Sequence, residues 1–245
     1  MQTRGLIITG TDTGVGKTFV AVEIIRALHD QGVRVGAYKP VVTGSFHGAA
    51  GPVWDDLARL QAALGGGDVP IERIAPQRFL APLAPPVAAR IEGQTVDGEL
   101  LRRGIDWWNG RVEVVVVEGA GGLLSPLTET ESLADVARDL EFPLVVVARL
   151  SLGTINHTLL TLEAAASRHL PVAGIILNEP VPSDPADCST ETNVEELERR
   201  CRVPILAILR HAATPDLLRM SPLFTIDWME YARRRGVGKS GRLES

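Results

Sequence analysis

The sequence predicts an α/β fold, in which a doubly wound, mainly parallel sheet carries helices on both faces. Short aliphatic runs alternate along the chain with stretches of helical periodicity, an order that favours right-handed crossovers between parallel strands. The run 112–117 is almost entirely valine, as expected of a strand that helices cover on both faces. Ligands of such sheets bind beyond the carboxyl ends of the strands, so residues at those ends are the candidates for a site.

The predicted elements follow one another in a regular order. Strands are predicted at 5–9, 33–38, 112–117, 144–148 and 172–177, with a weaker one at 203–208. Helices are predicted at 17–30, 54–64, 97–108, 132–140, 154–168 and 190–201. The Gly-rich stretch Gly44–Pro52 and the Pro-rich stretch Pro180–Asp187 are expected to be surface loops.

Length and composition indicate an ordinary globular chain. Of its 245 residues, 45% are hydrophobic and 22% charged, and we expect one domain over 1–232 and a basic, flexible tail over 233–245. The net charge of −5 argues against a nucleic-acid partner, and no apolar run approaches the ~20 residues that cross a bilayer. The two cysteines, Cys188 and Cys201, lack metal-ligand spacing and no signal-peptide pattern is present, so a cytoplasmic location is expected.

The segment Gly10–Thr18 is the most informative feature. It follows the apolar residues 6–8 and precedes a helix in which Val20, Ile24 and Leu28 recur every four residues. Its glycines allow a tight turn whose N–H groups point into the concave side of the loop. The positive end of the following helix faces the same space. Lys17 would reach terminal phosphates and Thr18 would ligate Mg²⁺, so the segment predicts a P-loop NTPase-like fold that binds ATP.

This loop departs from the strict motif, because five residues instead of four separate Gly10 and Gly16. The order strand, loop, helix nevertheless favours a phosphate site over a plain turn. A similar run at 236–240 has no strand before it and five residues after it, so we interpret it as an imitation without function.

Charged residues follow two of the predicted strands. Lys39 is held in an extended conformation by the next residue, a proline, and is either a solvated group or a second cation beside the phosphates. Glu118 precedes a Gly-rich turn and is either a capping acid or a Mg²⁺-directed acid. Asp55 and Asp56 open a predicted helix, where one could be a further Mg²⁺ ligand or both could simply cap it.

Two further strand ends carry candidates. Residues 152–157 begin a helix whose N–H groups could hold an anion such as a substrate carboxylate, and His157 within it is interpreted as a surface or packing residue. Asn178 ends another strand, where its amide suits the edge of adenine, although a turn-forming role is the alternative.

Taken together, these residues resemble one family, dethiobiotin synthase of biotin biosynthesis. The pieces G-T-D-T-G-V-G-K-T, Y-K-P-V-x-[ST]-G, V-E-G-A-G-G and L-G-T-I-N-H occur here in the order and spacing of that family, over residues 3–210. The resemblance implies a homodimeric ligase that joins CO₂ to 7,8-diaminononanoate through a carbamate and a carbamic–phosphoric anhydride. It would use ATP and Mg²⁺ and release ADP and phosphate.

The resemblance also implies roles for individual residues. Lys17 and Lys39 would hold the carbamate and the γ-phosphate, with Thr13 and Thr43 nearby, and Thr18, Asp56 and Glu118 would hold Mg²⁺. The nucleotide would be bound by Asp12, Thr13, Gly14, Val15, Gly16, Lys17, Thr18, Glu118, Gly121 and Asn178. Gly153, Thr154 and Asn156 would bind the carboxylate tail of the diamine or build the subunit contact beside it, and Asn193 of the neighbouring subunit would reach that substrate.

Two segments depart from the family. Residues 206–211 lack the Gly and Pro that usually shape the adenine pocket, and nothing from about residue 216 onward matches.

Two rival classes share the fold. Partitioning and division-site ATPases carry a Lys five residues before the loop Lys, where this chain has Asp12, and synthases of the cobyrinic acid diamide type need a glutaminase domain. The combination of Lys39 with Thr43 favours the dethiobiotin synthase reading over both.

Overall fold

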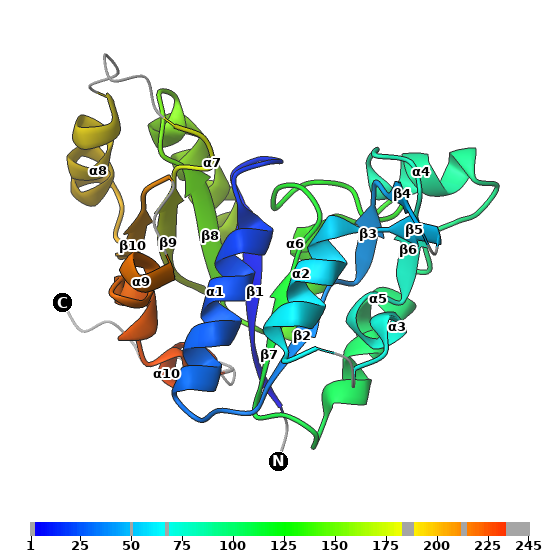
Figure 1. Cartoon of the computed structure of the whole chain (residues 1–245). Helices are drawn as coiled ribbons and strands as arrows, with labels where there is room; N and C mark the ends of the chain where they lie inside the picture. Colours follow the sequence, from blue (N-terminus) through cyan, green and yellow to red (C-terminus); the bar gives the residue numbers. More distant parts are fainter. Residues whose placement is uncertain (1–2, 50, 67–68, 183–188, 212–214, 234–245) are drawn as a thin grey trace, which may run out of the picture.

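The central sheet of the protein is six-stranded and wholly parallel. The computed structural model describes residues 3–49, 51–66, 69–182, 189–211 and 215–233, and its main sheet has the order β10-β9-β8-β1-β7-β2 (Figure 1). The strands are β1 (Arg4–Gly10), β2 (Val35–Tyr38), β7 (Val114–Glu118), β8 (Leu144–Arg149), β9 (Val172–Asn178) and β10 (Ile205–Leu209). All six predicted strands and the predicted fold class are therefore confirmed.

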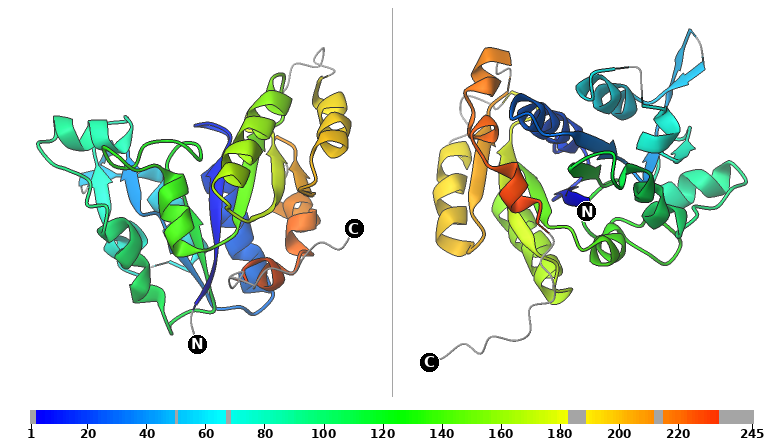
Figure 2. Two further views of the ribbon diagram at one scale, coloured as in Figure 1. Left: turned by 180° about the vertical axis from the view of Figure 1, so that it is seen from behind. Right: turned by 90° about the horizontal axis from the view of Figure 1, so that it is seen from below.

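Helices cover both faces of this sheet. In Figure 1, α1 (Lys17–Asp30) and α2 (Asp55–Ala63) lie in front of the strands. The reverse view in Figure 2 brings α6 (Leu133–Leu140) and α7 (Thr154–Ser167) to the front, and α8 (Ser189–Arg200) contacts α7. The valines of β7 are fully buried between these two layers, as predicted for a strand covered on both sides.

Five of the six predicted helices are confirmed to within a residue at each end, and one is wrong in form. The stretch 97–108 contains a single turn, α5 (Leu100–Arg103), followed by the 3₁₀-helix η1 (Gly104–Trp108). The hydroxyl of Tyr38 lies 3.0 Å from the carbonyl oxygen of Leu100 and 3.1 Å from that of Leu101. The Leu100 carbonyl also accepts the backbone N–H of Gly104, and a Cβ at Gly104 would collide with the Tyr38 hydroxyl, so this glycine allows Tyr38 to approach the chain where α5 gives way to η1.

A small lobe extends from the sheet beyond β2, at the upper right of Figure 1. It contains the parallel pair β3 (Val41–Thr43) and β6 (Gln77–Phe79), the antiparallel pair β4 (Phe46–Gly48) and β5 (Gly51–Val53), and the helix α4 (Pro85–Ile91), whereas α3 (Ile71–Ile74) lies below it in Figure 1, against β2 and α2. The expectation of a loop over Gly44–Pro52 is therefore wrong, because most of it pairs as a hairpin. Gly48 permits this pairing, since a Cβ there would lie 2.7 Å from Cγ2 of Val53.

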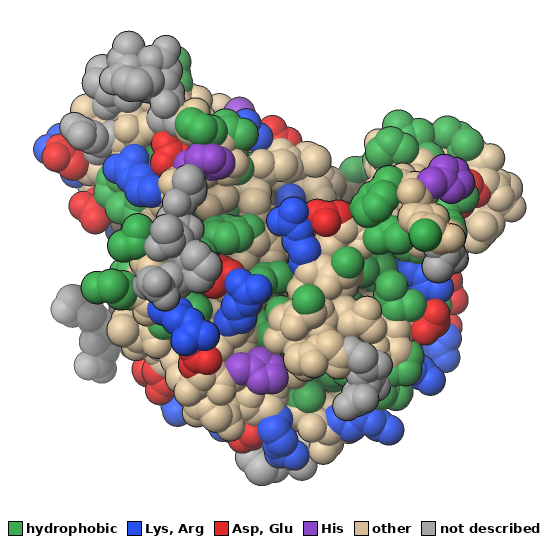
Figure 3. All heavy atoms as spheres, viewed as in Figure 1, with side chains coloured by type: hydrophobic (Ala, Val, Ile, Leu, Met, Phe, Trp, Pro, Cys, Tyr) green, Lys and Arg blue, Asp and Glu red, His purple; other side chains and the backbone are tan. Residues whose placement is uncertain are grey.

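The lobe also exposes apolar side chains, visible as green spheres at the upper right of Figure 3. They include Phe46 on β4 and Ile91 on α4, which are 56% and 66% exposed.

Of the Pro-rich stretch 180–187, residues 183–187 lie outside the described residues, as do Cys188 and the tail 234–245 with its imitation loop. The expected domain limits stay a prediction. No helix in the described ranges is both long and apolar enough to span a bilayer.

The segment after residue 215 packs against the N-terminal half of the chain. It comprises α9 (Pro215–Arg219), η2 (Pro222–Phe224) and α10 (Trp228–Tyr231). Trp228 is fully buried and donates from Nε1 to the carbonyl of Leu223 at 2.7 Å. The backbone N–H of Gly5 donates to the carbonyl of Ala232, so α10 covers the start of β1. This part of the chain, which the sequence left unexplained, completes the core beneath α1.

We predict that Trp228→Ala lowers the free energy of unfolding by about 3–5 kcal/mol, because it empties a fully buried aromatic site and frees a buried carbonyl. Met220→Ala is the control, since Met220 lies in the same segment but is 81% exposed, and it should change stability by less than about 0.5 kcal/mol. Urea denaturation monitored by circular dichroism measures both. Equal stability of the two variants would contradict the packing role of α10.

Candidate functional site

The glycine-rich loop between β1 and α1 is held in shape by contacts from several elements. Gly16 caps α1 with φ 96°, a left-handed conformation that favours glycine. A Cβ at this position would collide with Nδ2 of Asn178, the last residue of β9. That same Nδ2 donates to the carbonyl of Val15 at 2.8 Å. Asn178 therefore fixes the loop directly, in addition to any role toward a ligand.

Lys17 begins α1 and is nearly buried, with 7% of its surface exposed. Its Nζ donates to the backbone carbonyl of Asp12 at 2.9 Å, and the Asp12 carboxylate accepts the backbone N–H of Thr13 at 2.6 Å. Burial lowers the pKa of the Lys17 ammonium. The loop thus presents a poorly hydrated cation and the positive end of a helix with no acidic residue in its first turn, an arrangement that binds phosphate.

A cluster of four side chains lies beside this loop, and we call it the acid–lysine cluster: Thr18, Lys39, Asp56 and Glu118. They come from α1, the end of β2, α2 and the end of β7 respectively. Nζ of Lys39 lies 2.6 Å from Oε1 of Glu118 and 2.7 Å from Oδ2 of Asp56. The Thr18 hydroxyl lies 2.7 Å from both Asp56 Oδ1 and Glu118 Oε1. Residues separated by up to a hundred positions therefore meet at one point, as the strand-end rule predicts.

The acid–lysine cluster has the composition of a magnesium site. A threonine hydroxyl carries one proton, so it can donate to only one of its two carboxylate neighbours at a time. Oε2 of Glu118 is buried, and no described residue bonds to it. Two carboxylates and a hydroxyl are hard oxygen ligands of the kind Mg²⁺ prefers. The residues thus fit the ion, and the unsatisfied oxygen indicates that the acids accept more positive charge than Lys39 supplies.

The charges in the cluster shift each other's protonation. Burial alone would raise the pKa of Asp56, but the Lys39 ammonium and the hydrogen bonds from Lys39 and Thr18 outweigh it and hold that pKa below its ordinary value. Burial alone would lower the pKa of Lys39, but Glu118 and Asp56 together raise it. At neutral pH Asp56 is therefore ionised and Lys39 protonated, which is the state that a metal and an anionic substrate require.

The loop and the cluster border one cavity of about 650 Å³. Thr13 and Gly14 line it from the loop, Thr43 from β3 and Gly121 from the turn after β7. Val15 of the loop is buried, with 1% of its surface exposed, and Asp12 lies on the other side of the loop. The structure thus brings together most of the residues assigned to the nucleotide and the metal.

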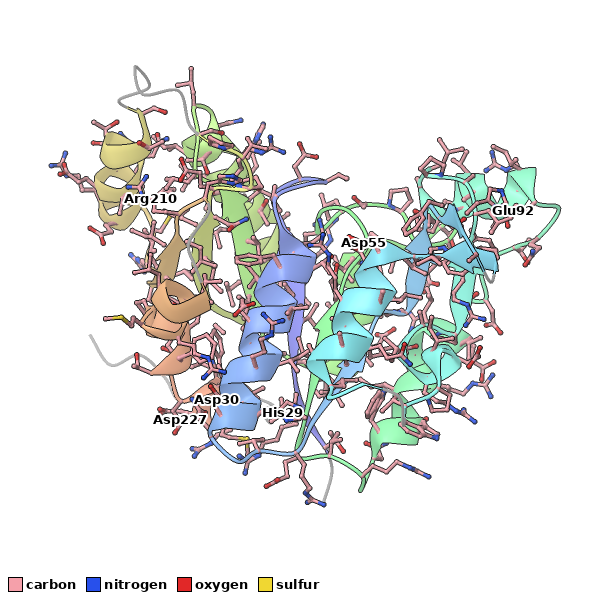
Figure 4. The ribbon with its side chains drawn as sticks, viewed as in Figure 1. His29, Asp30, Asp55, Glu92, Arg210 and Asp227 are labelled. Atoms are coloured by element: carbon pink, nitrogen blue, oxygen red, sulfur yellow. The ribbon has the colours of Figure 1, made fainter. Side chains whose placement is uncertain are left out.

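The other end of the cavity is lined by Asn178 and by four residues after it in the chain, Glu179, Pro180, Arg210 and His211. The backbone N–H of His211 donates to the Glu179 carboxylate at 2.9 Å, which joins the end of β10 to the end of β9. Figure 4 shows Arg210 on the β10 side of the molecule, across α1 from Asp55. The atypical segment 206–211 therefore borders the site, and whether Asn178 contacts adenine stays a prediction.

The residues assigned to the substrate tail lie elsewhere on the same edge of the sheet. Gly153 caps α7, Thr154 is buried and Asn156 is exposed, and none of them lines the 650 Å³ cavity. Asn193 on α8 is buried and donates to the carbonyl of Ser151 at 3.0 Å, so within one chain it braces the turn before α7. His157 is exposed on α7, as interpreted from the sequence.

Several cavity residues were given no role from the sequence, among them Phe19, Val42, Arg59 and Glu179. Arg59 stands three residues after Asp56 on α2, so helical spacing could have placed it on the same face. The two adjacent acids have different partners, because Asp55 pairs with Arg59 at 2.8 Å whereas Asp56 joins the acid–lysine cluster. Asp56 is thus the better placed metal ligand.

Comparison with known proteins gives a consistent result. The model of the AAA domain family matches residues 4–215. The ATP-dependent dethiobiotin synthetase BioD of Anaeromyxobacter dehalogenans (strain 2CP-C) is 47% identical over 88% of this chain and 93% of its own length. The enzymes of that name from Rhodopirellula baltica and Bacillus subtilis (strain 168) are 40% and 42% identical, over 88% and 84% of this chain and 87% and 86% of their own lengths.

We predict that Asp56→Asn weakens Mn²⁺ or Mg²⁺ binding at saturating ADP by at least about tenfold, because it removes one of the two carboxylates beside Thr18. Asp55→Asn is the matched control and should leave the metal affinity within about twofold of the wild type, since Asp55 faces Arg59. Titration calorimetry or Mn²⁺ paramagnetic resonance measures the affinity. A larger loss in Asp55→Asn would move the ligand to Asp55.

Proposed function

The chain belongs to the ATP-dependent dethiobiotin synthetase family, and we propose how its residues carry out that reaction. The enzyme closes the cyclic urea of dethiobiotin from 7,8-diaminononanoate and CO₂ in biotin synthesis, and it uses ATP. The observation that carries the assignment of the site is the acid–lysine cluster, which stands beside a phosphate-binding loop in a single cavity.

The proposed reaction needs no nucleophile from the protein. One amine of the diamine adds to CO₂ and loses a proton to give a carbamate. A carbamate oxygen attacks the γ-phosphorus of ATP, the bond between that phosphorus and the β–γ bridging oxygen breaks, and ADP leaves. The second amine then attacks the carbamoyl carbon, loses its proton and expels phosphate as the ring closes. Such chemistry needs fixed cations and orientation more than covalent help.

Lys17 and Lys39 supply those cations in the proposal. Lys17 stands in the loop where terminal phosphates bind, and its low hydration strengthens its attraction for them. Lys39 has three N–H donors and uses two of them on Asp56 and Glu118, which leaves one for a carbamate or γ-phosphate oxygen. Thr13 and Thr43 line the same cavity and can donate to the same anions.

Thr18, Asp56 and Glu118 would hold Mg²⁺, which when bound neutralises charge on the phosphate oxygens. The loop residues 12–18 and Gly121 would surround the phosphate chain with backbone N–H groups. Asn178 would contact adenine with the amide atoms that its bond to Val15 leaves over.

We also propose that the substrate tail binds where two copies of the chain meet. Leu152 and Leu160 around the start of α7 are 83% and 59% exposed, and Leu124 after β7 is 50% exposed. Leu124 and Leu160 border a second cavity of about 450 Å³, which Asp12 also lines. Exposed apolar residues around a hollow favour a protein partner, and Gly153, Thr154 and Asn156 would then serve the tail beside Asn193 of the neighbouring subunit. A cytoplasmic location, with no nucleic-acid or membrane partner, stays a prediction.

We predict that phosphate release from ATP and Mg²⁺ with bicarbonate depends on 7,8-diaminononanoate and equals the dethiobiotin formed. Lys39→Ala and Lys17→Ala should each lower kcat by about 10²–10³-fold, as expected for the loss of a cation or donor at a developing charge. Phosphate assay and mass spectrometry of the product measure both, with circular dichroism to show that each variant is folded. Diamine-independent hydrolysis, or near-normal turnover of Lys39→Ala, would contradict the proposal.

A separate prediction concerns the subunit contact. Leu160→Glu should yield a monomer that binds ATP within about twofold of the wild type but binds the diamine at least about tenfold more weakly, because the charge interrupts an apolar contact. Ile91→Glu is the matched control, since Ile91 is similarly exposed but lies on the distant lobe, and it should remain dimeric. Analytical ultracentrifugation and calorimetry measure these properties. A monomeric wild-type enzyme would rule out the shared site.

A further inference from the structure

We propose that Arg59, positioned by Asp55, binds the phosphate chain of the nucleotide. The inference rests on the proposed function of the cavity and adds a cation that the sequence motifs do not include. Arg59 lies on α2 and borders the same cavity as Thr18 and Phe19, the residues at the start of α1.

The position of Arg59 follows from helical spacing. Asp56 and Arg59 are three residues apart on α2, so they lie on one face of that helix, one turn from each other. Because the Asp56 carboxylate lies 2.7 Å from the Thr18 hydroxyl, this face of α2 is turned toward the first turn of α1. In phosphate-binding loops the α- and β-phosphates lie against backbone N–H groups at this point. Arg59 therefore stands opposite the phosphates across the cavity.

The guanidinium of Arg59 has donors to spare. Its Nε lies 2.8 Å from Oδ2 of Asp55, and no residue in the described part of the chain accepts from its two terminal nitrogens. Both side chains of the pair are more than half exposed, 57% for Arg59 and 60% for Asp55, so the terminal nitrogens of the guanidinium are open to a second anion while Nε stays on Asp55. A guanidinium matches two oxygens of a phosphate at once, which makes phosphate a suitable second anion.

The two lysines of the cavity already have partners within the chain. Lys17 donates to the carbonyl of Asp12, and Lys39 lies between two carboxylates. Asp55 holds Arg59 near the helix surface through Nε of the guanidinium. The two terminal nitrogens of Arg59 remain available to phosphate oxygens. The two adjacent acids of α2 thus have different tasks: Asp56 belongs to the metal site, whereas Asp55 orients a phosphate-binding arginine. Figure 4 shows Asp55 at the first turn of α2, the end nearest the loop.

The test is the affinity of full-length enzyme for MgATP, MgADP, MgGTP and MgCTP by titration calorimetry, in Arg59→Ala, Arg59→Lys and a matched control. Arg103→Ala is that control, because Arg103 forms the same kind of exposed i,i+4 pair with Glu99, at 3.0 Å on α5, away from the cavity. We expect Arg59→Ala to weaken ATP and ADP binding by about tenfold, the scale of one charge-assisted hydrogen bond. Arg59→Lys should recover part of that loss, and Arg103→Ala should bind as the wild type does.

Two further readouts separate a phosphate contact from other roles. The factor lost in Arg59→Ala should be the same for every base that binds measurably, and in the synthetase assay KM for ATP should rise while kcat stays within about twofold. Wild-type affinity in Arg59→Ala, or a loss that changes with the base, would overturn the inference while the proposed function stands. If the wild-type enzyme binds no nucleotide, the proposed function itself fails.

Discussion

The buried contact of Lys39 with Glu118 and Asp56 is the constraint on which the rest of the site depends. Lys39 is 4% exposed and Glu118 1% exposed, so neither charge is stable in the interior without the other. Removing one partner of such a pair costs about 3–5 kcal/mol, because it leaves a buried charge uncompensated. The contact therefore holds the ends of β2 and β7 and the start of α2 at one distance from the loop. The electrostatics that serve the reaction and the packing that positions its residues are the same interaction.

Much of this arrangement could be predicted from the sequence, because parallel sheets obey a simple rule about strand ends. The loop, Lys39 and Glu118 each follow a buried aliphatic strand, and the carboxyl ends of neighbouring parallel strands share one edge. The fold class and five of the six helices followed from the alternation of strand and helix patterns. For the adjacent acids of α2, spacing alone does not separate Asp55 from Asp56; the family resemblance favoured Asp56, and in the structure Asp56 is the one that joins the acid–lysine cluster.

The failures of prediction also have physical causes. The four strands of the lobe are each three residues long, too short for a period of two to mark them, and β4 and β5 also carry glycine or proline, which lowers their β-propensity. The stretch expected to be a helix at 97–108 contacts the Tyr38 hydroxyl at Leu100 and Gly104, a tertiary contact that local sequence does not reveal. Gly153 to Asn156 and Asn193 cannot be judged within one chain, because the role that the family resemblance gives them requires a second subunit. Arg59 was missed since its neighbour Asp55 makes it look like an ordinary surface pair.

The glycine-rich loop also separates the two cavities, and this explains why so small a segment carries so much of the function. Thr13 lines the larger cavity, while Asp12 beside it lines the second. Likewise, Gly121 lines the larger cavity and Gly122 lines the second. Each of these two turns therefore contributes residues to both cavities. A nucleotide in the larger cavity and a substrate tail in the second would approach the loop from opposite sides. Their reacting ends would then meet near the loop, between Lys17 within it and Lys39 beside it at the end of β2.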